Sequence, residues 1–129
     1  MIAIDTSVIV RFLVKDDREQ AQSARVLIEA EDVLVPTSVL LETEWVLRSA
    51  YKLPRQDLVT ALRAFLDLPR VFAQGREAAL AALDWAGQGM EFADALHLAS
   101  ASSCDAFASF DRKLLRAARK VGALEVRAP

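Results

Sequence analysis

Short apolar runs alternate with longer amphipathic runs along the whole chain, and this alternation is the strongest constraint on its fold. Five short apolar runs predict β-strands, at Ile2–Ile4, Val33–Val35, Val71–Ala73, Phe107–Ser109 and Leu124–Val126. Between them the helical period predicts seven helices, over about residues 7–15, 18–30, 38–51, 55–67, 76–87, 93–103 and 112–121. Connections of this length favour parallel strands with helices on both faces of the sheet. The sequence therefore predicts an α/β fold.

Length and composition limit the class of protein further. The 129 residues, 53% of them hydrophobic, suit a single domain over residues 1–129 that buries roughly two thirds of its unfolded surface. No apolar stretch approaches the roughly 20 residues of a membrane span. The one cysteine, Cys104, excludes an internal disulfide, and we expect it to be a small buried side chain. We expect a protein without membrane segments, located in the cytoplasm.

Charge is unevenly distributed along the chain. Sixteen basic and 18 acidic residues give a net charge of −2, so any attraction to a polyanion must be local. Basic residues gather on the last predicted helix, where Arg112, Arg116, Arg119 and Lys120 share one face. That face, together with Arg11, is a candidate for phosphate contacts, and the alternative is a solvated face. We expect Trp45, Trp85, Tyr51 and the six phenylalanines in the core or an interface, with base stacking as the alternative.

Two aspartates lie just after predicted strands. Asp5 comes after the first strand and Asp111 after the fourth, so both are expected at the carboxyl edge of the sheet, where α/β folds bind ligands. For Asp5 the alternative is a helix cap that accepts a backbone N–H. Their shared placement favours a common site.

Glu42 and Glu44 lie on one predicted helix and cannot share a face. A helical wheel places Glu42 between Trp45 and Val46, whereas Glu44 has Arg48 one turn later as a surface partner. We therefore expect Glu42 to be buried, where a carboxylate needs a cation or donors. The alternative is a buried Glu42 paired to an arginine from elsewhere.

Asp94 is expected in the first turn of an alanine-rich helix, where the helix dipole favours an anion whether or not it binds a ligand. His97, one turn later, is expected to be a packed or hydrogen-bonded core residue rather than a ligand. If Asp5, Glu42, Asp94 and Asp111 converge, a cation would relieve their repulsion. Oxygen ligands without histidine or cysteine suit Mg²⁺ or Mn²⁺ rather than zinc.

Several short motifs together resemble one known family. They are Asp5-Thr6-Ser7 after a strand, Pro36 with Glu42 six residues on, Phe92-Ala93-Asp94-Ala95-Leu96-His97 at a helix start, and Ser109-Phe110-Asp111-Arg112 after a strand. In this order they resemble the PIN-domain ribonucleases, most of all their VapC-type bacterial toxins, over essentially the whole chain. The resemblance implies a PIN-like three-layer sandwich with a mostly parallel central sheet of about five short strands.

The same resemblance implies a function. The four acidic positions would bind Mg²⁺ or Mn²⁺ and cleave RNA. Thr6 and Ser7 would orient Asp5, and Ser109 would orient a neighbouring carboxylate or a metal-bound water. Many relatives carry threonine at the position of Ser109, and some carry asparagine at that of Ser7. VapC-like proteins are usually homodimers neutralised by a VapB-like antitoxin, whose peptide enters the acidic cleft.

Other functions share parts of this pattern. A PIN-domain nuclease in RNA processing, or a catalytically silent PIN domain that only binds, would keep the fold without a toxin role. A receiver-like phosphoacceptor domain has a similar length and an acidic Mg²⁺ site, but it carries paired acids after its first strand, where this chain has Asp5-Thr6-Ser7. A haloacid-dehalogenase-like phosphatase would need a second aspartate at the position of Ser7.

Overall fold

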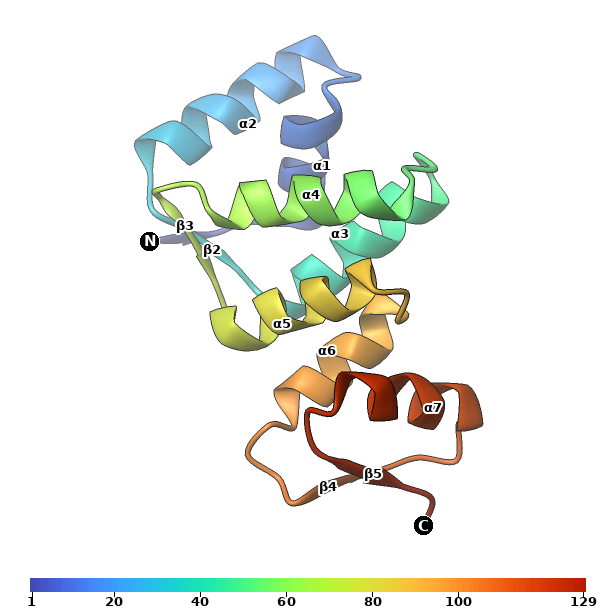
Figure 1. Cartoon of the computed structure of the whole chain (residues 1–129). Helices are drawn as coiled ribbons and strands as arrows, with labels where there is room; N and C mark the ends of the chain where they lie inside the picture. Colours follow the sequence, from blue (N-terminus) through green and yellow to red (C-terminus); the bar gives the residue numbers. More distant parts are fainter. The chain divides into compact units, whose positions relative to one another are not determined.

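The computed structural model describes residues 1–129 as an α/β chain of seven helices and five short strands (Figure 1). The strands are β1 (Ile2–Ala3), β2 (Val33–Val35), β3 (Val71–Ala73), β4 (Ala106–Ala108) and β5 (Glu125–Arg127). The helices are α1 (Thr6–Val14), α2 (Arg18–Ala30), α3 (Thr37–Ser49), α4 (Arg55–Leu66), α5 (Arg76–Gly87), α6 (Phe92–Ser100) and α7 (Arg112–Val121). No helix combines the length and hydropathy that crossing a lipid bilayer requires.

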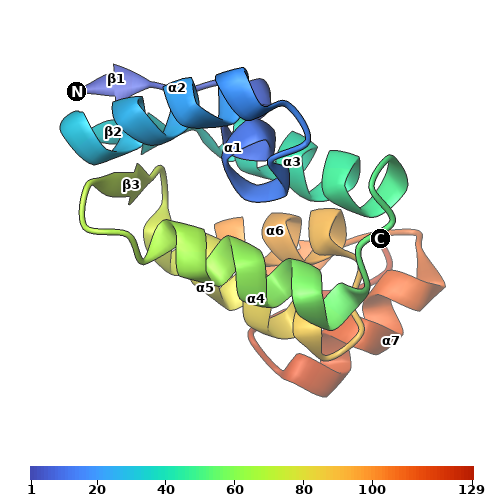
Figure 2. The same ribbon diagram turned by 90° about the horizontal axis from the view of Figure 1, so that it is seen from above.

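Residues Met1–Arg76 form the first of two compact units. Its sheet has the strand order β1-β2-β3, and both pairings are parallel, with Ile2 beside Val33 and Val33 beside Val71. Helices α1 and α2 form a hairpin (Figure 2). The core is apolar, and its largest fully buried side chains include Ile9, Leu40, Leu47, Leu62 and Phe65.

Residues Glu77–Pro129 form the second unit. Strands β4 and β5 pair in parallel, with Phe107 beside Val126, and α7 is the helix between them in the chain (Figure 1). The buried residues Leu114, Leu115 and Ala118 lie on one side of α7, as its amphipathic pattern predicts. All five strands thus pair in parallel, as predicted, and hydrogen bonding divides them into groups of three and two.

Candidate functional site

Asp5 immediately precedes α1 in an extended conformation (φ −87°, ψ 164°), two residues after β1 ends. Its side chain is exposed and accepts no backbone N–H from the helix, so the helix-cap alternative does not hold. The hydroxyl of Ser7 instead donates to Oδ2 of Asp5 at 3.2 Å, and Oδ1 has no hydrogen bond. Ser7 thus holds Asp5 through one carboxylate oxygen, and the other oxygen is free to bind a ligand.

Thr6 links the first turn of α1 to α3. Its side chain is buried, and its hydroxyl donates to Oε1 of Glu42 at 2.5 Å. Glu42 therefore lies beside the residue that follows Asp5, although the two acids are 37 positions apart in the chain. The sequence suggested that Thr6 would orient Asp5; in the structure Ser7 bonds Asp5, and Thr6 bonds Glu42.

The predicted burial of Glu42 and Glu44 is wrong. Glu42 is exposed, whereas Glu44 is only 7% exposed and forms the predicted ion pair with Arg48, at 3.0 and 3.3 Å. The helical wheel was oriented on Trp45 as a core residue, but Trp45 is 58% exposed. The buried residues of α3 are Leu40, Thr43, Glu44 and Leu47. Glu42 therefore belongs to the exposed side of α3, and Thr6 rather than burial holds it.

Asp94 lies in the first turn of α6, as predicted, and is half-buried. Burial raises the pKa of its carboxyl, and the negative charge of Asp111 raises it further, while His97 and Lys113 act in the opposite direction. Asp94 and Asp111 are thus close enough to repel each other. A cation bound beside them would offset that repulsion.

Asp111 caps helix α7. Its Oδ1 accepts the backbone N–H of Lys113 at 2.9 Å and that of Leu114 at 3.1 Å, and Oδ2 has no hydrogen bond. Ser109 forms no hydrogen bond with this carboxylate; its hydroxyl accepts the backbone N–H of Asp111 at 3.0 Å. Ser109 therefore fixes the chain at the start of α7, and the cap fixes the side chain.

Asp5, Glu42 and Asp111 share one arrangement: a donor of the chain binds one carboxylate oxygen and the other carries no hydrogen bond. Asp5 and Glu42 belong to the first unit, and Asp94 and Asp111 to the second. Each unit taken by itself lacks a group of three or more acidic, histidine or cysteine side chains arranged to hold a metal ion. Each unit thus carries two of the four predicted acids.

Arg11, a predicted RNA contact, is engaged within the first unit. Its guanidinium donates to Gln20 at 2.6 Å, to Asp16 at 3.1 Å and to the hydroxyl of Tyr51 at 3.3 Å, and Tyr51 donates to Asp16 at 2.9 Å. The bond to Tyr51 is the main cause that raises the pKa of Arg11. These contacts join α1 to the start of α2 and to the segment after α3. Gln20 and Tyr51 are members of this network that the sequence did not reveal, since no local pattern connects them.

Other predicted residues lie at the surface. Arg112 and Arg116 are exposed and form no ion pair, as expected of phosphate contacts and of a solvated face alike. His97 and Cys104 are exposed, so the predictions that they are packed inside are wrong. His97 lies on the outer side of α6, opposite the buried Phe92, Ala95 and Ala99, and Cys104 lies in the loop before β4.

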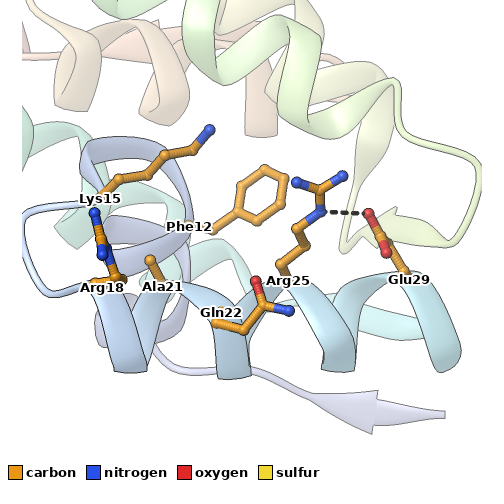
Figure 3. A pocket seen from close by; sticks show the side chains of 7 residues that line it. All are labelled: Phe12, Lys15, Arg18, Ala21, Gln22, Arg25 and Glu29. Atoms are coloured by element: carbon orange, nitrogen blue, oxygen red, sulfur yellow. Dashed lines mark hydrogen bonds and ion pairs between the residues drawn. The ribbon is translucent and has the colours of Figure 1, made fainter.

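One hollow of the first unit does not include any of the four candidate acids in its lining. It has a volume of about 490 Å³, and its lining includes Phe12, Lys15, Arg18 and Arg25, the last paired to Glu29 at 2.8 Å (Figure 3). A smaller hollow of about 310 Å³ is lined partly by Ser7, the residue that holds Asp5.

The chain matches the family model of the PIN domain over residues 2–120, which includes all four acids and parts of both units. A search of curated proteins found no match. PIN domains are generally nucleases that depend on a divalent metal and act on nucleic acids, in keeping with the carboxylate pairs described above. Because the match covers most of the sequence, this chain belongs to the PIN domain family.

Proposed function

We propose that this protein is a Mg²⁺-dependent ribonuclease, and that Asp5, Glu42, Asp94 and Asp111 hold the metal and cleave RNA phosphodiester bonds. The observation that carries the proposal is the state of these carboxylates. Three keep one oxygen without a hydrogen bond, and the fourth, Asp94, is half-buried next to another negative charge. The free oxygens are available to bind a hard cation, and a cation would also offset the repulsion between Asp94 and Asp111.

The donor set fits a hard divalent cation. All four candidate ligands are carboxylates, which favours Mg²⁺ or Mn²⁺ over zinc. The bound ion would supply an activated water and charge stabilisation for in-line attack on the phosphodiester. Ser7 would fix Asp5, Thr6 would fix Glu42, and Ser109 would hold the backbone at Asp111. Membership of the PIN family removes the receiver-domain and phosphatase alternatives.

We further propose that the protein is the toxin of a VapBC-type toxin-antitoxin module, acting as a homodimer and neutralised by a VapB-like antitoxin. The support is the resemblance of its motifs, from Asp5-Thr6-Ser7 to Ser109-Phe110-Asp111-Arg112, to those of VapC-type toxins. Cationic side chains of the antitoxin would pair with the same carboxylates. Arg112 and Arg116, which form no ion pair, would contact the RNA backbone.

Cleavage of a labelled single-stranded RNA by the purified protein tests the nuclease. Products should form with Mg²⁺ and not with EDTA. Replacement of one acid at a time, by Asp5→Asn, Glu42→Gln, Asp94→Asn or Asp111→Asn, should lower the rate about 100-fold or more. The controls are Glu19→Gln and Asp105→Asn, which remove an exposed acid from each unit. Undiminished cleavage in EDTA would refute the proposal, and so would wild-type activity in the four variants.

The toxin role has its own test. Induced expression of the wild-type chain should arrest growth of a bacterial host, and Asp5→Asn should not. Gel filtration with light scattering of the purified protein measures whether it is a dimer. Growth arrest by the inactive variant, or a nuclease that leaves growth unaffected, would contradict the toxin role while leaving the nuclease in place.

A further inference from the structure

Another hollow, of about 280 Å³, lies entirely within the second unit. Trp85 near the end of α5 and Gln88 just after that helix form part of its wall, and α7 contributes Lys113, Arg116 and Lys120. Its volume is near the lower end of the range for small-molecule sites, roughly 300–1,000 Å³. The hollow therefore suits a group the size of one nucleotide rather than a folded partner.

The cations of this hollow have no competing partners. Lys113, Arg116 and Lys120 follow the spacing i, i+3, i+7 and so share a face of α7. None of them forms an ion pair, and no acidic residue lines the hollow. Arg112 and Arg119 of the same helix do not line it. Only some of the basic residues of α7 therefore line this hollow.

The opposite wall supplies an aromatic surface. Trp85 is half-buried, and Met90, which also lines the hollow, is buried. A tryptophan held in this way offers a fixed indole for stacking, which binds any base because every base has a π-face. Gln88 adds an exposed amide that can both donate and accept hydrogen bonds.

We propose that this hollow is a subsite for one nucleotide of a single-stranded RNA, with the base against Trp85 and the flanking phosphates bound by Lys113, Arg116 and Lys120. The proposal rests on the proposed function in taking RNA as the ligand. Lys120 lies seven positions after Lys113, a rise of about 10 Å along the helix, which suits a strand better than a single small anion. An acidic peptide would pair with the same cations but would gain little from the indole.

The subsite also has a definite relation to the acids of the second unit. Lys113 lines the hollow, its backbone N–H binds Asp111, and its charge lowers the pKa of Asp94. A nucleotide in the hollow would therefore lie next to the Asp94 and Asp111 pair. The hollow would fix the position of the strand, and the acids would act on a neighbouring phosphodiester.

Binding without cleavage tests the subsite. The assay uses the Trp45→Phe variant in EDTA, in which Trp85 is the only tryptophan. An oligouridylate of eight nucleotides should quench the fluorescence of Trp85 in a saturable manner. The triple change Lys113→Gln, Arg116→Gln and Lys120→Gln should weaken binding at least about 10-fold. It should also flatten the slope of log K against log salt by about 2, at roughly 0.7 per single-strand phosphate contact.

Matched variants separate the hollow from general charge. Arg119→Gln removes a cation of α7 that does not line the hollow, and it should leave the affinity and the salt slope close to those of the parent. With a labelled oligonucleotide, Trp85→Ala should weaken binding about five- to thirty-fold, and Trp85→Phe should restore most of it. Circular dichroism of each variant checks that it is folded.

Three results would overturn the subsite: no quenching of Trp85, equal losses in Arg119→Gln and in the triple variant, or equally tight binding of an octaglutamate peptide. The last would make the hollow a general anion site. Because the assay contains no metal, it is independent of cleavage. RNA cleavage without binding in the hollow would refute only the subsite, whereas binding without Mg²⁺-dependent cleavage would refute only the nuclease.

Discussion

Asp111 has two tasks that substitution can separate. Its Oδ1 caps α7 through the N–H groups of Lys113 and Leu114, while Oδ2 remains without a hydrogen bond and is proposed to bind the metal. Asn keeps an oxygen that can accept both cap bonds, but it lacks the charge. Asp111→Asn should therefore keep the structure and lose the chemistry, and Asp111→Ala should lose both.

The size of the structural effect follows from the cap. Loss of a helix cap typically costs about 1 kcal/mol, with a range of roughly 0.5–2 kcal/mol. For a protein of 129 residues that corresponds to a decrease of about 3–5 °C in Tm. Asp111→Ala should show this decrease in thermal unfolding in EDTA. Asp111→Asn should unfold at or above the wild-type temperature, because it also removes the repulsion with Asp94.

Asp17 provides the control for this comparison. It caps α2 by accepting the N–H of Gln20 at 3.0 Å and has no proposed role in metal binding. Asp17→Ala should destabilise the protein about as much as Asp111→Ala while leaving RNA cleavage largely intact. If Asp111→Asn unfolds as early as Asp111→Ala, the cap is not the source of the stability. If Asp111→Asn still cleaves RNA at the wild-type rate, the carboxylate is not a metal ligand.

Three further changes test single contacts. Arg48→Ala should lower the free energy of unfolding in urea by about 1–2 kcal/mol, because it leaves the buried Glu44 without its partner. Arg25→Ala, which breaks an exposed ion pair, should cost at most about 0.5 kcal/mol. Equal losses in the two variants would contradict this account. Thr6→Val should reduce the rate of RNA cleavage about 10- to 100-fold, and Thr6→Ser should retain it. Wild-type cleavage by Thr6→Val would show that the hydrogen bond to Glu42 is dispensable. In metal-free protein, Asp94→Asn should raise the unfolding midpoint at pH 7. The pKa of Asp94 is raised in the folded protein, so the stability that the protonated carboxyl allows below the ordinary value of 3.8 is lost as the pH rises through the folded pKa. If the gain from Asp94→Asn persists below pH 3.8, this cause is refuted.

The secondary structure was largely predictable because its limits are set locally. Pro36 ends β2, and Gly122 ends α7 in the left-handed conformation (φ 64°), so the predicted bounds of both elements are those of the structure. Other bounds differ by at most two residues, and helix α6 departs furthest, since it ends at Ser100 rather than near 103. No glycine or proline follows it, and the polar residues after Ser100 gave no clear stop.

The site was predictable only where its geometry is local. Asp5 and Asp111 follow strands, and the order of residues alone places them beside helix starts. The support of Glu42 comes from Thr6, 36 residues away, which no helical period encodes. The wheel failed for a related reason: it assumed that Trp45 faces the core, and only the packing of α3 against other helices shows which side is buried. An amphipathic pattern shows which residues of a helix share a face. An exposed large apolar residue that is taken as buried makes the wrong face look like the one that packs against the core.

The hydroxyl residues near the acids show the same limit at the level of single hydrogen bonds. Thr6, Ser7 and Ser109 all stand within two positions of a candidate ligand, and a hydroxyl can either donate or accept. Ser7 donates to the nearby carboxylate, Thr6 donates to one on another helix, and Ser109 accepts a backbone N–H. The same kind of neighbour thus performs three tasks, so each needs its own substitution. Removal of Ser109 should act through the start of α7, whereas removal of Ser7 or Thr6 should act through one carboxylate.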